Sequence, residues 1–187
     1  MPRIRAFIAL PTSNEIKQQI TAIQSQLKET HADVRWEGAE KFHITLKFLG
    51  DSEPEVLQSL ASNLRDSLRE TRSFDLLYDA LGCFPGASRP RVVWVGAHEN
   101  PHIASLQQLV EEVCVRFGFA KEDRAFHPHI TLGRVKGNRH VDRLTETLKT
   151  VTFDPLQARC NEIHIMRSEL RPTGSVYSLL NSIPLQS

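Results

Sequence analysis

The chain has 187 residues, of which 40% are hydrophobic and 24% charged, and its formal net charge is +1. This length suits one domain with a buried core. The near-neutral charge argues against a protein that holds long nucleic acid, because such proteins usually carry a marked basic excess. Cys83, Cys114 and Cys160 are odd in number and widely spaced, so we expect reduced thiols in a cytoplasmic protein rather than disulfides. The apolar run Phe7–Leu10 is too short for a signal peptide, and we expect no membrane span.

The first half of the sequence predicts alternating strands and helices. Apolar residues at helical spacing predict a helix that is capped by Thr12 or Ser13 and runs to about Lys28. Pro54 is well placed in the first turn of a second helix, whose apolar stripe ends at Leu68. Strands are expected at Arg5–Leu10, Val34–Glu37, Phe42–Leu49 and Phe74–Leu81, and a loop rich in Gly and Pro at Gly82–Pro90.

The second half repeats the order strand, helix, strand. Its expected elements are a strand at Arg91–Ala97, a helix from Pro101, a strand at His129–Val135, a short helix at Val141–Leu148 and closing strands at Glu162–Met166 and Val176–Leu180. The repetition indicates a duplicated α+β unit. We therefore expect a single domain over residues 1–187, made of two pseudo-symmetric lobes at about 1–90 and 91–187, with some strand exchange possible.

One tetrapeptide, HITL, occurs at His43–Leu46 and again at His129–Leu132, once in each half and each time in a predicted strand. Side chains of a strand alternate between its faces, so His43 and Thr45 project to one side and the two aliphatic residues to the other. The same alternation holds for His129 and Thr131. If the two halves pack around a pseudo-two-fold axis, both pairs can face one cleft.

Two imidazoles that face one ligand suit phosphodiester chemistry. One must be neutral to accept a proton from the attacking oxygen, and the other must be protonated to give one to the leaving oxygen. The ordinary histidine pKa of roughly 6.5 allows both states near neutral pH. The threonine hydroxyls can donate hydrogen bonds to the phosphate oxygens, and no metal is needed.

A metal site is the alternative, because His127 and His129 are two residues apart. No Asp, Glu or Cys is spaced nearby as a third ligand, and Pro128 disturbs the local alternation. We therefore expect no metal and no other cofactor, with His127 at the rim of the site.

Two basic residues follow the motifs. Lys47 keeps the parity of His43 and Thr45, so it either reaches the phosphate or ends in solvent. Arg134 is an odd step from His129, but a bulge at Gly133 would turn its guanidinium back towards an anionic phosphate.

Aromatic residues near the motifs are candidates to stack on a nucleobase. Phe42 and Phe126 flank the two motifs, and Tyr177 lies in a closing strand. Packing in the core is the alternative for each of them, and for Trp36, Phe84 and Trp94 as well.

These motifs resemble the 2H (two-histidine) phosphoesterase superfamily, and in particular its RNA 2′,3′-cyclic phosphodiesterases, which are also described as 2′-5′ RNA ligases. The resemblance spans almost the whole chain. It is carried by the segments RAFIAL, VRW, KFHITLKFLG, GCFP, RPRVVWVG, HPHITLGRV and IHIMRSELRPTGSVYSLL.

The resemblance implies a bilobal α+β fold, with two antiparallel sheets around a central cleft and helices on the outside. It implies that His43 is the proton donor and His129 the proton acceptor, that Thr45 and Thr131 bind phosphate oxygens, and that Arg134 assists them. His129 would activate water for attack on phosphorus, and His43 would protonate the departing ribose O3′, which leaves a 2′-phosphate.

The expected partners are RNA or oligonucleotide ends with a 2′,3′-cyclic phosphate, or small nucleotides, bound by a monomer. Hydrolysis competes with the reverse reaction, in which a 5′-hydroxyl attacks to form a 2′-5′ bond. Water at about 55 M favours hydrolysis unless the RNA partner is held tightly. A nucleotide-binding module without turnover is a further alternative, against which the two intact histidines weigh, because binding alone requires no acid and base.

Overall fold

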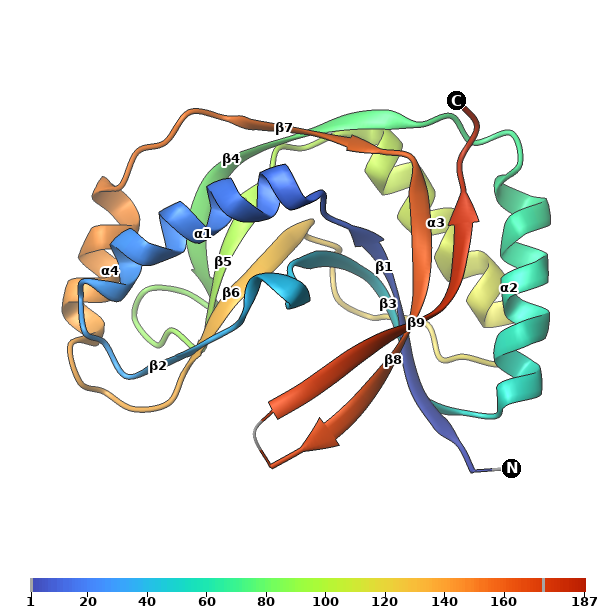
Figure 1. The fold of residues 1–187 in the computed structure, drawn as a ribbon, viewed down its shortest axis with the longest axis horizontal. Helices are drawn as coiled ribbons and strands as arrows, with labels where there is room; N and C mark the ends of the chain where they lie inside the picture. Colours follow the sequence, from blue (N-terminus) through green and yellow to red (C-terminus); the bar gives the residue numbers. More distant parts are fainter. Residues whose placement is uncertain (1, 173) are drawn as a thin grey trace.

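A computed structural model describes residues 2–172 and 174–187 as a strongly curved antiparallel sheet with helices on its outside (Figure 1). The strands are β1 (Ile4–Pro11), β2 (Val34–Trp36), β3 (His43–Ser52), β4 (Phe74–Phe84), β5 (Val92–Ala97), β6 (His129–Val135), β7 (Leu156–Cys160), β8 (Glu162–Arg171) and β9 (Gly174–Pro184). The helices are α1 (Asn14–Lys28), α2 (Pro54–Leu68), α3 (Pro101–Arg116) and α4 (Val141–Thr150), with a 3₁₀ turn, η1, at Ala39–Lys41. The α+β class is therefore confirmed.

Helix α1 follows from its sequence pattern. Ser13 is the capping residue, and its hydroxyl oxygen accepts a hydrogen bond of 3.3 Å from the backbone N–H of Ile16. The stripe that includes Ile20 and Leu27 is fully buried. Helix α2 begins at Pro54 as expected and buries its own stripe.

Strands β3, β4, β8 and β9 extend beyond the predicted bounds, and one strand, β7, is absent from the sequence prediction. Strand β4 continues to Phe84, which pairs with Val92, so the start of the expected loop Gly82–Pro90 is strand. Strand β7 is not predicted, because its buried residues are only Leu156, Ala158 and Cys160 in a short alternation. Pairing along the whole of β7 with β4 makes up for this weak local signal.

The two expected sheets share an edge. The order of strands is β7-β4-β5-β6-β3-β1-β8-β9, with β2 paired to β6, and every neighbouring pair is antiparallel. At the junction, β3 and β6 pair only through Ile44 and Ile130. The sheet therefore consists of two halves that meet at the two HITL segments.

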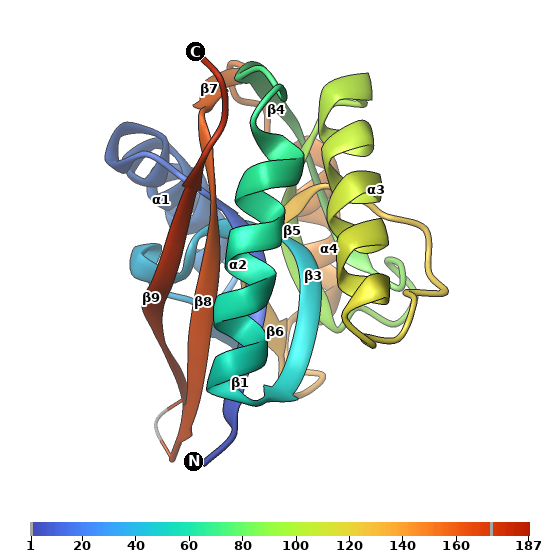
Figure 2. The same ribbon diagram turned by 90° about the vertical axis from the view of Figure 1, so that its right-hand side faces the viewer.

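Each sheet half contains strands from both ends of the chain. Strands β8 and β9 lie beside β1, whereas β4 leaves the N-terminal part of the chain to pair with β5. Helices α2 and α3 lie side by side in both views (Figures 1 and 2), and they pack together and cover the β3 side of the sheet. Among the described residues, none of the helices has the length and apolar character needed to cross a membrane.

Strand β3 contains a bulge at Leu46, the last residue of its HITL segment. Ile8 of β1 pairs with Lys47 and Ala9 pairs with Thr45, so Leu46 has no partner in β1. The extra residue turns Lys47 to the helix-covered face, where it is 5% exposed and its Nζ lies 2.7 Å from Oε1 of Glu111 in α3. The parity prediction for Lys47 is therefore wrong: it lies neither beside the histidines nor in solvent.

The Lys47–Glu111 pair also fixes the segment that leads to β6. Lys47 donates to the carbonyl of Ala120 at 2.6 Å, and Glu111 Oε1 accepts the backbone N–H of Glu122 at 2.9 Å. A buried charge is costly once its partner is removed. The pair therefore ties α3, β3 and the chain before His129 into one unit.

We expect Lys47→Met to lower the free energy of unfolding by about 3 kcal/mol, because it leaves the Glu111 carboxylate buried and unpaired. Glu111→Leu should have a similar effect. The double variant should lose clearly less than the sum of the two losses. Urea denaturation of all four proteins measures this cycle, and a Lys47→Met variant within 0.5 kcal/mol of the wild type would contradict the buried-pair assignment.

Candidate functional site

The junction of the sheet halves brings the two HITL segments together. Ile44 and Ile130 pair there and are 1% and 0% exposed, on the face covered by helices. The alternation then puts His43 and His129 on the opposite face, where both are half-buried. The imidazoles are close enough that the charge of His129 lowers the pKa of His43.

His43 lies against two aromatic rings. The Phe7 ring stacks on the imidazole with a centroid distance of 4.9 Å, and the Tyr177 ring meets its edge at 5.5 Å. Burial lowers the pKa of His43 to about 4, a hydrogen bond to the backbone carbonyl of Lys41 opposes this, and the charge of Lys17 lowers it further. Burial therefore favours the neutral imidazole.

His129 has a similar environment in the other half. Phe84 meets it edge-on at 4.9 Å, and Trp94 lies at 6.5 Å. Nδ1 of His129 is 2.6 Å from the backbone oxygen of His127. A carbonyl can only accept, so Nδ1 carries the proton and Nε2 of the neutral ring is free to accept one. Burial lowers the pKa of His129 as well, followed by the hydrogen bond to His127, which raises it, and the charges of His127 and Arg134, which lower it.

The two histidines are thus held in the same way. The carbonyl of the residue two positions before each imidazole, Lys41 or His127, raises its pKa, and each imidazole contacts two aromatic rings. This arrangement fixes the ring orientation and leaves the second nitrogen for a ligand. Thr45 and Thr131 lie on the same face as the imidazoles and are half-buried.

The bulge expected at Gly133 is present. Val93 pairs with Gly133 and Trp94 with Thr131, so Leu132 has no partner in β5, and Arg134 returns to the face of His129. A Cβ on Gly133 would lie 2.6 Å from a methyl group of Val34, so glycine is required where β2 pairs with β6.

Glu37 connects the two sides of the site. Its carboxylate lies 3.0 Å from Nζ of Lys41 and 3.7 Å from Nε of Arg134. The side-chain amide of Gln24 in α1 is 2% exposed and donates to the backbone oxygens of Glu37 and Leu132, at 2.8 and 2.9 Å. This amide therefore anchors the end of β2 to the bulge that positions Arg134.

The expected aromatic residues lie in different places. Tyr177 touches His43. Phe126 is half-buried and packs against the core. Phe42 is 1% exposed, so it supports the strand from within the core and offers no ring face to a base. We therefore correct the stacking prediction for Phe42.

Sequence reasoning did not identify Phe7, Lys17, Glu37 and Gln24. For Gln24 a signal exists, because it is a polar residue on the buried stripe of α1, four positions after Ile20. Phe7, Lys17 and Glu37 come close to the histidines only through tertiary contacts, which no local sequence pattern indicates.

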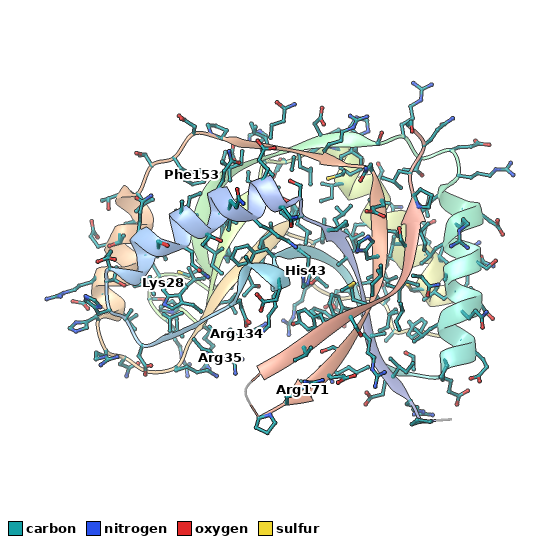
Figure 3. All side chains as sticks on the ribbon, viewed as in Figure 1. Lys28, Arg35, His43, Arg134, Phe153 and Arg171 are labelled. Atoms are coloured by element: carbon teal, nitrogen blue, oxygen red, sulfur yellow. The ribbon has the colours of Figure 1, made fainter. Side chains whose placement is uncertain are left out.

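A pocket lies on the α1 side of His43. Its lining includes Lys17 from α1, His164 and Met166 from β8, and Tyr177 from β9. Figure 3 shows three arginines below His43: Arg134 and Arg35 to the left, and Arg171 of the β8–β9 hairpin directly below. Within the described part of the chain, no three His, Cys, Asp or Glu side chains are grouped as metal ligands.

Fold and motifs together define a two-histidine phosphoesterase: a curved antiparallel sheet with one H-x-T motif on each side of its central junction. The sequence profile of the 2′-5′ RNA ligase superfamily matches residues 11–172, and the chain belongs to this family. It is 34% identical to the RNA 2′,3′-cyclic phosphodiesterase of Methanothermobacter thermautotrophicus, over 94% of this chain and 96% of that protein. It is 30% identical to the enzyme of the same name from Thermotoga maritima, over 95% and 93%.

The same fold occurs in the crystal structure of E. coli LigT complexed with 3′-AMP. The TM-score is 0.78 with 26% sequence identity, and the match covers 99% of each chain. The comparison therefore extends over both sheet halves and their helices.

The buried neutral His43 predicts a pH-dependent stability. Its pKa is about 4 in the folded protein and roughly 6.5 when unfolded, so only the unfolded chain binds the proton between these values. Stability should therefore fall by up to about 3 kcal/mol as the pH falls from 6.5 to 4. His43→Gln should lose this part of the dependence in urea denaturation at several pH values. The exposed His31, replaced by Asn, is the control, and an unchanged slope in His43→Gln would contradict the assignment.

Proposed function

We propose that this protein hydrolyses the terminal 2′,3′-cyclic phosphate of RNA to a 2′-phosphomonoester by metal-independent acid–base catalysis. The observation that carries the proposal is the pair of histidines on one face of the sheet junction, each fixed by a backbone carbonyl. The names of the relatives, RNA 2′,3′-cyclic phosphodiesterases, support the substrate class. The complex of E. coli LigT with 3′-AMP supports a nucleotide as ligand.

His129 acts as the general base. Its Nδ1 proton is committed to the carbonyl of His127, so Nε2 accepts a proton from water. Burial lowers the pKa of this imidazole, which keeps it neutral and able to accept. The water oxygen then attacks phosphorus as its proton passes to Nε2.

His43 acts as the general acid. Burial disfavours its imidazolium, but a phosphodiester anion between the histidines favours the charged form and so raises its pKa on binding. The imidazolium gives its proton to O3′ as the P–O3′ bond breaks, and the phosphate remains on O2′. His129 then releases its proton to solvent, and His43 takes one up from solvent.

The neighbouring groups stabilise the phosphate. The hydroxyls of Thr45 and Thr131 donate to its non-bridging oxygens, and the guanidinium of Arg134 pairs with the charge that develops there. Glu37 lies 3.7 Å from Nε of Arg134 and so orients the guanidinium without occupying all of its donors.

Product analysis tests this reaction. Adenosine 2′,3′-cyclic phosphate incubated with the protein and a chelator should give 2′-AMP. His43→Ala and His129→Ala should each lower the rate by about 10²–10⁴-fold, because each removes one proton transfer. Circular dichroism shows whether the variants fold. Formation of 3′-AMP would reverse the leaving oxygen, and full activity in either variant would refute the mechanism.

The pKa values predict two different pH profiles. In the free protein the active form needs neutral His129 and protonated His43, and the pKa of both is below 6.5. The value of kcat/KM should therefore peak below pH 6.5. Bound substrate raises the pKa of His43, so the basic limb of kcat should lie at higher pH. Steady-state kinetics from pH 4 to 8 measures both, and superimposable profiles would contradict the shift on binding.

A further inference from the structure

The two strands have different residues two positions after the bulge. In the sequences HITLKF and HITLGR, the sixth position is Phe48 in one half and Arg134 in the other. Both strands have the same succession of burial up to this point, and in both the extra residue is the leucine of HITL. Phe48 therefore returns to the face of His43, as Arg134 returns to the face of His129.

Phe48 is an exposed aromatic residue on the face of the site. It is 67% exposed, and it pairs in register with Phe7, whose ring centroid is 6.4 Å away. The Phe7 ring in turn contacts His43 and lies 5.0 Å from the Tyr177 ring. An aromatic surface thus extends from the imidazole outwards, with the buried Phe7 as its floor and Tyr177 and Phe48 at its sides.

A cation lies next along the same strand. Ala9 and Pro11 of β1 line the pocket beside His43, and Phe7 contacts the imidazole, so the alternation puts Arg5 on this face as well. Arg5 is exposed, and no carboxylate in the described residues lies within 4 Å of its guanidinium. It pairs in register with Asp51, beyond Phe48 on β3.

We propose that Phe48 and Arg5 bind the nucleotide that precedes the cyclic phosphate end of the RNA. This proposal rests on the function proposed above, in which the terminal ribose lies on the side of His43, because His43 protonates its O3′. The chain before that ribose then runs outwards along β1 and β3. Phe48 stacks on the preceding base, and Arg5 pairs with the phosphate that joins the two nucleotides.

Single-stranded RNA fits this surface better than a protein does. Aromatic rings combined with a positively charged group are the usual elements of a surface that binds single strands. The surface is continuous with the histidines, so whatever occupies it must extend from the reacting phosphate. It holds one base and one phosphate, which agrees with a chain whose net charge is only +1.

Kinetics with two substrates test the proposal. The first is adenosine 2′,3′-cyclic phosphate, and the second is the dinucleotide ApA with the same cyclic end. Phe48→Ala should lower kcat/KM for the dinucleotide about 10-fold and leave the mononucleoside unchanged, because stacking on one base is lost. Phe48→Trp should keep the preference for the dinucleotide. Leu77→Ala, which removes an exposed apolar side chain from β4, is the matched control and should change neither substrate.

The salt dependence tests Arg5 separately. Arg5→Gln should reduce the slope of log kcat/KM against log salt concentration by about 0.7 for the dinucleotide, because one phosphate contact is lost, and not for the mononucleoside. Arg167→Gln is the control and should leave the slope unchanged. Arg167 pairs in register with Ala6, so it lies on the face of the sheet away from the histidines.

Four outcomes would overturn the proposal that Phe48 and Arg5 bind the preceding nucleotide. The wild type could show no preference for the dinucleotide, or Phe48→Ala could lower kcat/KM equally for both substrates or for neither. Arg5→Gln could leave the slope unchanged, or the wild type could self-associate through Phe48. Failure of the proposed function differs from all of these, because the wild type would then not hydrolyse the mononucleoside either.

Discussion

The pairing of Ile44 with Ile130 is the contact on which the rest of the site depends. Strands β3 and β6 pair in register only at these two residues, yet they join the two halves of the sheet and put one HITL segment on each side of the junction. Both isoleucines are buried beneath the helix-covered face, so the residues before and after them must face the other way. Burial of two aliphatic side chains therefore decides the position of both imidazoles.

The bulges at Leu46 and Leu132 allow each strand to present different kinds of residue to the site before and after the bulge. Up to the threonine, β3 and β6 present polar groups to the site. Beyond the extra leucine the faces are exchanged, and Lys47 anchors helix α3 while Arg134 and Phe48 return to the open side. The two halves are similar because both strands have this bulge, and they differ because the site-facing residue after it is Phe48 in β3 and Arg134 in β6. This difference gives the site a direction, with a cation on the side of His129 and an aromatic ring on the side of His43.

Much of the fold could be predicted from the sequence, because the helices and most strands have strong periodicity. The repeated HITL also indicated that His43, Thr45, His129 and Thr131 share one face, because the alternation of side chains along a strand does not depend on the details of packing. Lys47 shows where this reasoning fails: its parity is correct only for a regular strand, and nothing in KFLG announces the extra residue. Phe42 could not be distinguished from a stacking residue, because a ring beside the HITL motif can point to either face of the strand. Glu37 and Gln24 are set by contacts between α1, β2 and β6 that no local pattern contains.

The anchor made by Glu111 has a consequence for the proton on His129. Glu111 holds Lys47 and the backbone of Glu122, and the chain from there leads within a few residues to the carbonyl of His127. That carbonyl fixes which nitrogen of His129 carries the hydrogen. The tautomer of an imidazole on one face of the sheet is therefore coupled to how a helix packs on the other. A displacement of α3 that moved this carbonyl would therefore change which ring nitrogen of His129 carries the hydrogen.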